Sequence, residues 1–258
     1  MSGPPQGNKT PINLKLSIGG RPLEAVVDVP AKAVRSVDLL PILQAMDDAV
    51  IDVAAETVRQ QGKTITCRAG CGACCRQLVP ITETDAHYLC ELIAEMPPER
   101  RRQVERRFDD ALDALDRAGM LDRLLGAAEI ADRDRRRQLG LDYFELKVPC
   151  PLLQDESCSV HLHRPMVCRE YLVTTPAANC SAPLPQRIEK VQIPVTLSKL
   201  LSRFGDGKGE RPARWLPLVL ALRWVAERRG SDDPEVELST LPGAEMFENF
   251  VNLVSSHE

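Results

Sequence analysis

The sequence has few histidines and no long apolar run, and both absences limit what the protein can be. Four histidines in 258 residues are too few for us to identify a Ser/His/Asp catalytic set. The most apolar stretch, residues 215–226, is interrupted by Pro217 and Arg223 and falls short of the roughly 20 residues that span a bilayer. The N-terminal residues 1–11 lack the apolar core of a signal peptide. We therefore expect a cytoplasmic protein with no membrane partner.

The sequence also lacks a strong excess of charge of one sign. The formal net charge is −4, and 27% of the residues are charged, so the composition gives no reason to expect nucleic acid as a partner. Arginine is concentrated in residues 100–107 and 133–137, but acidic residues are interleaved there, which is typical of solvated helix faces. The apolar share of 43% is that of a globular protein with a hydrophobic core. No feature of the sequence identifies a protein partner.

The N-terminal region predicts a β-hairpin followed by a long helix. Residues 12–18 and 23–29 alternate between apolar and polar side chains, and a Gly-Gly pair separates the two runs. From Ser36 onward the apolar residues recur every three or four positions. This spacing predicts a helix that has Ser36 as its N-cap and ends at Gly62.

Further helices are predicted on either side of an irregular segment. Apolar periodicity places them at residues 83–95, 99–118, 121–139, 195–204, 212–228 and 242–254. Thr82 or Thr84 is the expected N-cap of the first of these. Residues 143–185 are rich in Pro, Cys and Ser, which predicts irregular structure apart from a short helix at residues 165–171. Residues 188–193 are predicted to form a strand.

These elements predict an α+β fold that is mainly helical. We expect the N-terminal β-hairpin and the helices to surround an irregular, cysteine-rich metal-binding centre. Three regions follow from this reading. Residues 1–62 form the N-terminal hairpin and helix, residues 63–182 the cysteine-cluster metal-binding domain, and residues 183–258 a C-terminal helical region packed on it.

Cysteine is the residue type whose distribution points to chemistry. The chain has nine cysteines, and a reducing cytoplasm disfavours structural disulfides, so clustered thiols indicate metal or redox chemistry. Small Gly and Ala residues surround the first cluster, and they would let the chain curl tightly around a metal. This cluster consists of Cys67, Cys71, Cys74 and Cys75.

A second, more widely spaced set supplies further thiols. It consists of Cys150, Cys158, Cys168 and Cys180. The eight cysteines together are enough for two four-coordinate sites, or for one cluster with reserve ligands. We expect the two sets to converge in space and to bind the metal. Cys90 lies on the apolar face of a predicted helix, and we expect it to be a core residue outside the metal site.

The spacing leaves iron and zinc as alternatives. Zinc favours paired C-x2-C units, and only Cys71 with Cys74 forms one. The adjacent cysteines of the first cluster and the Cys150-Pro151 pair favour an iron–sulfur cluster instead. Either centre, held by four thiolates, carries a formal charge of about −2 and needs hydrogen-bond donors or cations nearby. The arginines that flank the cysteines could supply them: Arg68, Arg76, Arg164 and Arg169.

The cysteine segment resembles a known family. Residues 67–75, Cys-Arg-Ala-Gly-Cys-Gly-Ala-Cys-Cys, resemble the signature of the bacterial YkgJ-type cysteine-cluster proteins, a zinc- or iron-chelating domain with a CxxCxxCC motif. Residues 150–153, 158–161 and 164–169 resemble the later motifs of that family. The resemblance covers residues 63–182 and implies that the chain binds zinc or iron.

One branch of the family, the flagellin lysine N-methylases, resembles this segment in its cysteines and implies an iron–sulfur cluster and S-adenosylmethionine. We do not carry that activity over, because nothing outside the cysteine segment matches. An iron–sulfur enzyme of the methyl-transfer or electron-transfer kind is therefore the alternative to a metal-binding module. In that alternative Arg164 and Arg169 are the candidate cofactor-binding residues, since they could meet an anionic ligand such as a carboxylate.

Overall fold

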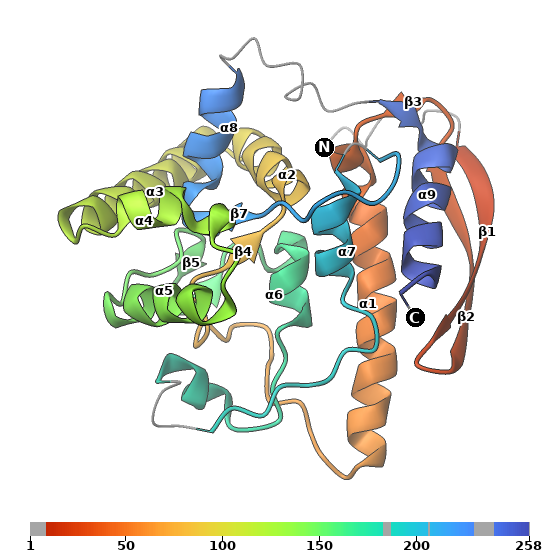
Figure 1. Ribbon diagram of the computed structural model, residues 1–258, viewed down its shortest axis with the longest axis horizontal. Helices are drawn as coiled ribbons and strands as arrows, with labels where there is room; N and C mark the ends of the chain where they lie inside the picture. The colour runs from red at the N-terminus through yellow and green to blue at the C-terminus, as the bar shows by residue number, and fades with distance from the viewer. Residues whose placement is uncertain (1–8, 183–186, 206, 230–239, 258) are drawn as a thin grey trace.

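The computed structural model describes residues 9–182, 187–205, 207–229 and 240–257. Over these residues the fold is α+β and mainly helical, as predicted, with one long β-hairpin and several two-residue strand pairs (Figure 1). Within the same residues, each helix is too short or too polar to cross a membrane.

The N-terminal hairpin forms where apolar and polar residues alternate. Strands β1 (Lys9–Ile18) and β2 (Arg21–Pro30) pair antiparallel along their whole length. Gly19 and Gly20 make the two-residue turn, and both have positive φ, at 57° and 75°, which suits glycine in a tight hairpin. From Leu14 onward every second residue of β1 is buried. This apolar face of the hairpin packs against helix α9 (Gly243–Ser255), as Figure 1 shows.

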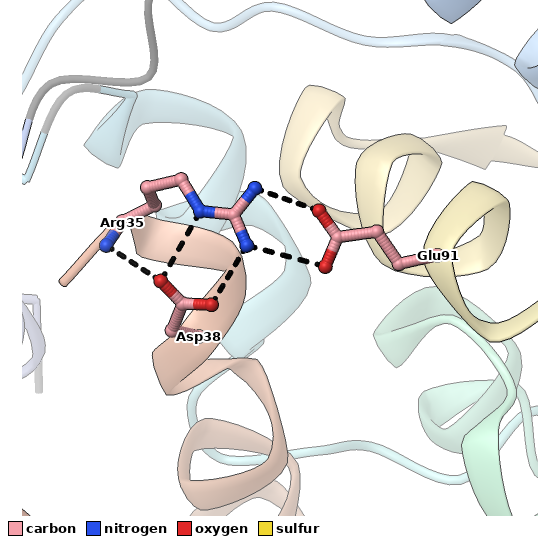
Figure 2. Close-up of polar contacts among 3 residues, drawn as sticks. All are labelled: Arg35, Asp38 and Glu91. Carbon is pink, nitrogen blue, oxygen red and sulfur yellow. Dashed lines mark hydrogen bonds and ion pairs between the residues drawn. The ribbon is translucent and has the colours of Figure 1, made fainter. Parts of the chain in front are cut away.

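Helix α1 (Ser36–Gln60) begins one residue earlier than predicted. Its N-cap is Arg35, and Ser36 is the first helical residue, so the prediction of Ser36 as the cap is wrong. Asp38 takes over the capping role, because its carboxylate accepts a hydrogen bond of 2.9 Å from the Arg35 peptide N–H. The Arg35 guanidinium also binds Asp38 at 2.8 Å and Glu91 at 2.7 Å (Figure 2). The second pair joins the start of α1 to the next helix.

That next helix, α2 (Glu83–Ala94), has the predicted cap. The Thr82 hydroxyl accepts a hydrogen bond of 3.0 Å from the Asp85 peptide N–H, which selects Thr82 over Thr84 as the N-cap. The remaining predicted helices that appear with nearly unchanged bounds are α3 (Pro98–Arg117), α6 (Met166–Glu170), α7 (Leu197–Phe204) and α9 (Gly243–Ser255).

Three predictions are corrected by long-range or local contacts. The helix predicted at 121–139 is divided into α4 (Leu121–Leu125), a 3-10 turn and α5 (Arg133–Glu145), because the chain is extended at Ile130 and Asp132 caps a new helix. The strand predicted at 188–193 is reduced to a single bridge, between Val173 and Lys190.

The helix predicted at 212–228 also begins later than expected. Residues Leu216–Pro217 form strand β7, which pairs with β4 (Pro80–Ile81) and so cannot be helical. A 3-10 turn at Leu218–Leu220 then leads into α8 (Ala221–Arg229). Two other short pairs connect distant segments, β3 (Ala33–Val34) with β8 (Leu241–Pro242) and β5 (Leu153–Gln154) with β6 (Ser157–Cys158).

Two large hydrophobic clusters flank the cysteine-bearing segment. The first combines the hairpin, α1, α7 and α9, together with Met166 of α6. The second combines α2, α3 and α8, and partly buried cysteines pack against it, among them Cys90. The Cys90 sulfur lies 3.9 Å from the Ala221 carbonyl oxygen, so its packing against the core agrees with its predicted place. A third cluster lies around α4 and α5.

We predict that Phe250→Ala will strongly destabilise the first cluster. Phe250 is fully buried, and its ring packs edge-on against Phe204 with 5.1 Å between the ring centroids. Urea denaturation should show the free energy of unfolding falling by about 3–5 kcal/mol. Val26, which is 68% exposed in the hairpin, gives a control, since Val26→Ala should cost less than about 1 kcal/mol. Equal losses in the two variants would contradict the packing.

Candidate metal centre

The first cysteine set lies in the loop between α1 and β4. Thr66 fixes the start of this loop, because its peptide N–H donates to the Val173 carbonyl at 3.0 Å and its hydroxyl donates to the Thr175 carbonyl at 2.6 Å. A turn follows in which the Cys71 N–H donates to the Arg68 carbonyl at 3.1 Å. These bonds place the loop beside the segment that follows α6.

The second half of the loop packs against the β5–β6 hairpin. The Cys75 N–H donates to the Gly72 carbonyl at 3.0 Å and closes another turn. A Cβ atom added at Gly72 would lie 2.5 Å from the carbonyl oxygen of Glu156, so this close approach requires glycine. Arg76 adds an ion pair of 2.6 Å to the Glu156 carboxylate on the same hairpin.

The second cysteine set is joined to the first by backbone and side-chain hydrogen bonds. The Cys150 N–H donates to the Cys75 carbonyl at 2.7 Å. Cys158 lies in β6, Cys168 lies in α6, and Cys180 lies in a 3-10 turn where it is buried. Gln77 connects the last of these to the first loop, because its side-chain amide donates to the Cys180 carbonyl at 3.1 Å. Sequence reasoning missed Gln77, for which the sequence offers no signal.

The thiols of the two cysteine sets influence one another electrostatically. The pKa of Cys150 is raised to about 12 and that of Cys180 to about 11, and burial is the largest cause of both shifts. The negative charge of Cys74 further raises the pKa of cysteines in both sets, namely Cys67, Cys75, Cys150, Cys158, Cys168 and Cys180. The charge of Cys71 also raises the pKa of Cys67 and Cys180. Cys74 therefore acts on thiols of both cysteine sets.

Cys74 itself has the opposite shift. Its pKa is lowered to about 7, mainly because the Cys75 thiol donates a hydrogen bond to its sulfur. The same bond raises the pKa of Cys75 far above its usual range. The two side chains face each other because residues 73–76 form a turn, whereas neighbouring side chains of an extended segment would point apart.

The cysteine side chains of the described residues do not have the geometry of metal ligands. All nine cysteines are free thiols. Among the residues that the structure describes, no three His, Cys, Asp or Glu side chains stand in a geometry that could hold a metal ion. The donor set is nevertheless suited to soft metals, because thiolates select zinc and iron–sulfur clusters over hard cations.

The two candidate cofactor-binding arginines have different surroundings. Arg169 is 7% exposed, and its guanidinium donates to Asp48 of α1 at 2.6 Å and to the Leu162 carbonyl. Its Nε donates to the Arg164 carbonyl at 3.3 Å. Arg169 therefore joins α6 to α1, and its donors are engaged within the fold.

Arg164 instead acts electrostatically on the thiols. The hydrogen bond from Cys75 is the largest cause that lowers the pKa of Cys74, and the positive charge of Arg164 lowers it further. Burial raises the pKa of Cys67 and Cys158, and the charge of Arg164 opposes that rise. A small cavity beside Cys150 is lined by Gln77, Tyr143 and other residues, but by neither Arg164 nor Arg169.

Asp47 is a second residue that sequence reasoning missed. It is fully buried on α1, and both of its carboxylate oxygens lack a hydrogen-bond partner among the described residues. Burial, and then the negative charge of Glu170 on α6, raise its pKa well above the usual range. Glu170 accepts hydrogen bonds from the Ser198 N–H and hydroxyl. Asp47 stands in the apolar stripe of α1 between Leu43 and Val50, and this break in the pattern could have identified it.

We predict that Asp47 makes the fold less stable as pH rises. The folded-state pKa is above the unfolded value, so between the two values only the native state holds this proton, and the free energy of unfolding falls with increasing pH. In Asp47→Asn this loss should be smaller from about pH 5 to about pH 8 when urea denaturation is measured on reduced, metal-free protein.

Asp52 offers the matched control for that experiment, because it is exposed on the same helix. Asp52→Asn should keep the pH dependence of the unmodified chain. If Asp47→Asn and Asp52→Asn follow the same curve, the buried carboxyl of Asp47 is not the group responsible.

Comparison with known proteins supports metal chelation. Residues 66–184 match a family model named CxxCxxCC and described as "Putative zinc- or iron-chelating domain". The matched stretch begins one residue before Cys67 and extends past Cys180, so it contains both cysteine sets. No curated protein and no solved structure matches the chain.

Proposed function

We propose that the two cysteine sets together bind a metal centre and that the chain is a metal-holding module. The proposed ligands are Cys67, Cys71, Cys74, Cys75, Cys150, Cys158, Cys168 and Cys180. The observation that carries the proposal is the hydrogen bond of 2.7 Å between Cys150 and Cys75. It brings the second set to the first, inside the stretch that matches a chelating family.

An iron–sulfur cluster is the favoured centre, and zinc is the alternative. The compressed first set, with Cys74 and Cys75 adjacent, departs from the paired C-x2-C units of structural zinc sites. Eight thiols exceed the four that one cubane cluster needs, which leaves reserve ligands or a second centre. Soft sulfur donors suit both metals, so metal analysis separates them.

A module is favoured over an enzyme because of Arg169. The methyl-transfer or electron-transfer alternative requires a place for an anionic cofactor, and Arg169 was one of its two candidate residues. Its guanidinium is engaged with Asp48, the Leu162 carbonyl and the Arg164 carbonyl, and the residue is 7% exposed. Arg164 is then the arginine that the centre can use.

The ligand assignment predicts which cysteines matter for metal content. Protein purified without oxygen should contain iron with acid-labile sulfide and a broad visible absorption, or zinc without colour. Cys150→Ser and Cys168→Ser should lower the metal content severalfold, because each removes a thiolate ligand.

Cys90→Ser is the control for these variants, since Cys90 packs against the second hydrophobic cluster and should leave the metal content unchanged. Wild-type protein that takes up neither metal under anaerobic reconstitution would refute the function. A loss in Cys90→Ser equal to that in Cys150→Ser would refute the ligand assignment.

Metal removal should loosen the second cysteine segment before the rest of the fold. Residues 146–182 contain only two-residue strands, 3-10 turns and the short helix α6, so bound metal is expected to supply much of their folding free energy. Chelation should make them protease-sensitive while α1, which is anchored in the first hydrophobic cluster, stays protected. Mass spectrometry of timed digests measures this. Equal protection with and without metal would contradict it.

A further inference from the structure

Arg164 has a buried donor that the fold leaves without an acceptor. It follows the 3-10 turn at His161–His163 and precedes Pro165 at the start of α6. Its Nε is buried and has no hydrogen-bond partner among the described residues. An unsatisfied buried donor costs about 1–3 kcal/mol, and more when it is charged. A donor of this kind is tolerated where the functional state supplies an acceptor.

The rest of Arg164 is held in place. Its carbonyl accepts hydrogen bonds of 3.3 Å from the Gln44 side chain and of 3.3 Å from Arg169 Nε. One terminal nitrogen of its guanidinium contacts His161 Nε2 at 2.5 Å. Because both backbone and side-chain ends are anchored, the guanidinium cannot turn freely to find another acceptor.

Arg164 stands in the chain between Cys158 and Cys168, so the thiols are the candidate acceptors for this donor. Its charge acts on the thiols of Cys67, Cys74 and Cys158, which belong to both cysteine sets. The other arginines that flank the cysteines are placed differently. Arg68 is exposed, Arg76 is bound to Glu156 at 2.6 Å, and Arg169 is bound to Asp48 at 2.6 Å. Arg164 is thus the flanking arginine with a buried donor still available.

We propose that Arg164 is a positioning residue of the metal centre: its Nε–H donates a hydrogen bond to a ligand sulfur, and its charge offsets that of the thiolates. The inference rests on the proposed function and deepens it. A centre held by four thiolates carries a formal charge of about −2. Hydrogen bonds to ligands from outside the coordination sphere commonly change metal affinity by about 10–100-fold.

Two Arg164 variants separate the charge from the hydrogen bond. Arg164→Lys keeps the positive charge but has no Nε–H at that position, and Arg164→Gln loses both. Arg76→Gln is the matched control, since it removes a positive charge next to Cys75 that is already bound to Glu156. Circular dichroism and thermal melting of the metal-free variants establish that each is folded.

Two measurements on these variants test the proposal. Competition with a chromophoric chelator gives the zinc affinity, which should fall about 10-fold or more in Arg164→Gln, less in Arg164→Lys and under about threefold in Arg76→Gln. Cobalt(II) substitution gives the sulfur-to-metal charge-transfer band. The band should move to longer wavelength in both Arg164 variants and stay in place in Arg76→Gln, because losing an N–H···S bond raises the energy of the sulfur electrons.

The outcomes distinguish this proposal from the function on which it rests. If both Arg164 variants bind metal as tightly as the wild-type protein and show its cobalt band unchanged, the role of Arg164 is overturned and the metal centre still stands. Equal affinity losses in Arg164→Gln and Arg76→Gln would reduce the effect to unspecific charge and overturn it as well. Absence of metal in the wild-type protein would overturn both. If Arg164→Gln does not fold, the cobalt band of Arg164→Lys alone decides.

Discussion

The hydrogen bond from the Cys150 peptide N–H to the Cys75 carbonyl is the constraint on which the candidate centre depends. It holds together two loops that the sequence separates widely, and each loop alone supplies thiols without a complete site. Closing so long a loop has an entropic cost that grows slowly with length, and local contacts offset it. The close approach of Gly72 to Glu156 and the bond from Gln77 to Cys180 act at the same junction. These contacts join the two cysteine-bearing loops through the backbone.

Local patterns predicted the elements but not their connections. The alternation in the hairpin and the three-to-four spacing of α1 follow from side chains that meet one core, and a single segment carries that information. The pairing of β4 with β7 depends on two-residue strands far apart in the chain, which have no period to detect. That pairing is also why residues 216–217 are not helical. Residues 188–193 were predicted to form a strand, but among the described residues they form only the single bridge between Val173 and Lys190.

The candidate site divides in the same way. Spacing alone singled out the eight cysteines, because closely spaced thiols in one segment are typical of metal or redox sites. It could not rank Arg164 above Arg169, since both flank Cys168 and only burial and partners distinguish them. Gln77 binds the backbone carbonyl of Cys180, and every residue has a backbone carbonyl, so the sequence does not reveal this contact. Asp47 was detectable, because a carboxylate within an apolar stripe contradicts the pattern around it, and such a contradiction is a signal in its own right.

Helix α6 is where these features meet. It carries Cys168, and the next two residues of the helix lie against α1. Arg169 binds Asp48, and Glu170 lies beside Asp47. Met166 at its start belongs to the first hydrophobic cluster. A shift of Cys168 toward a metal would therefore move charged groups that lie against α1, where buried charges tolerate little displacement. The position of Cys168 is therefore fixed by contacts of α6 with the first hydrophobic cluster and with α1.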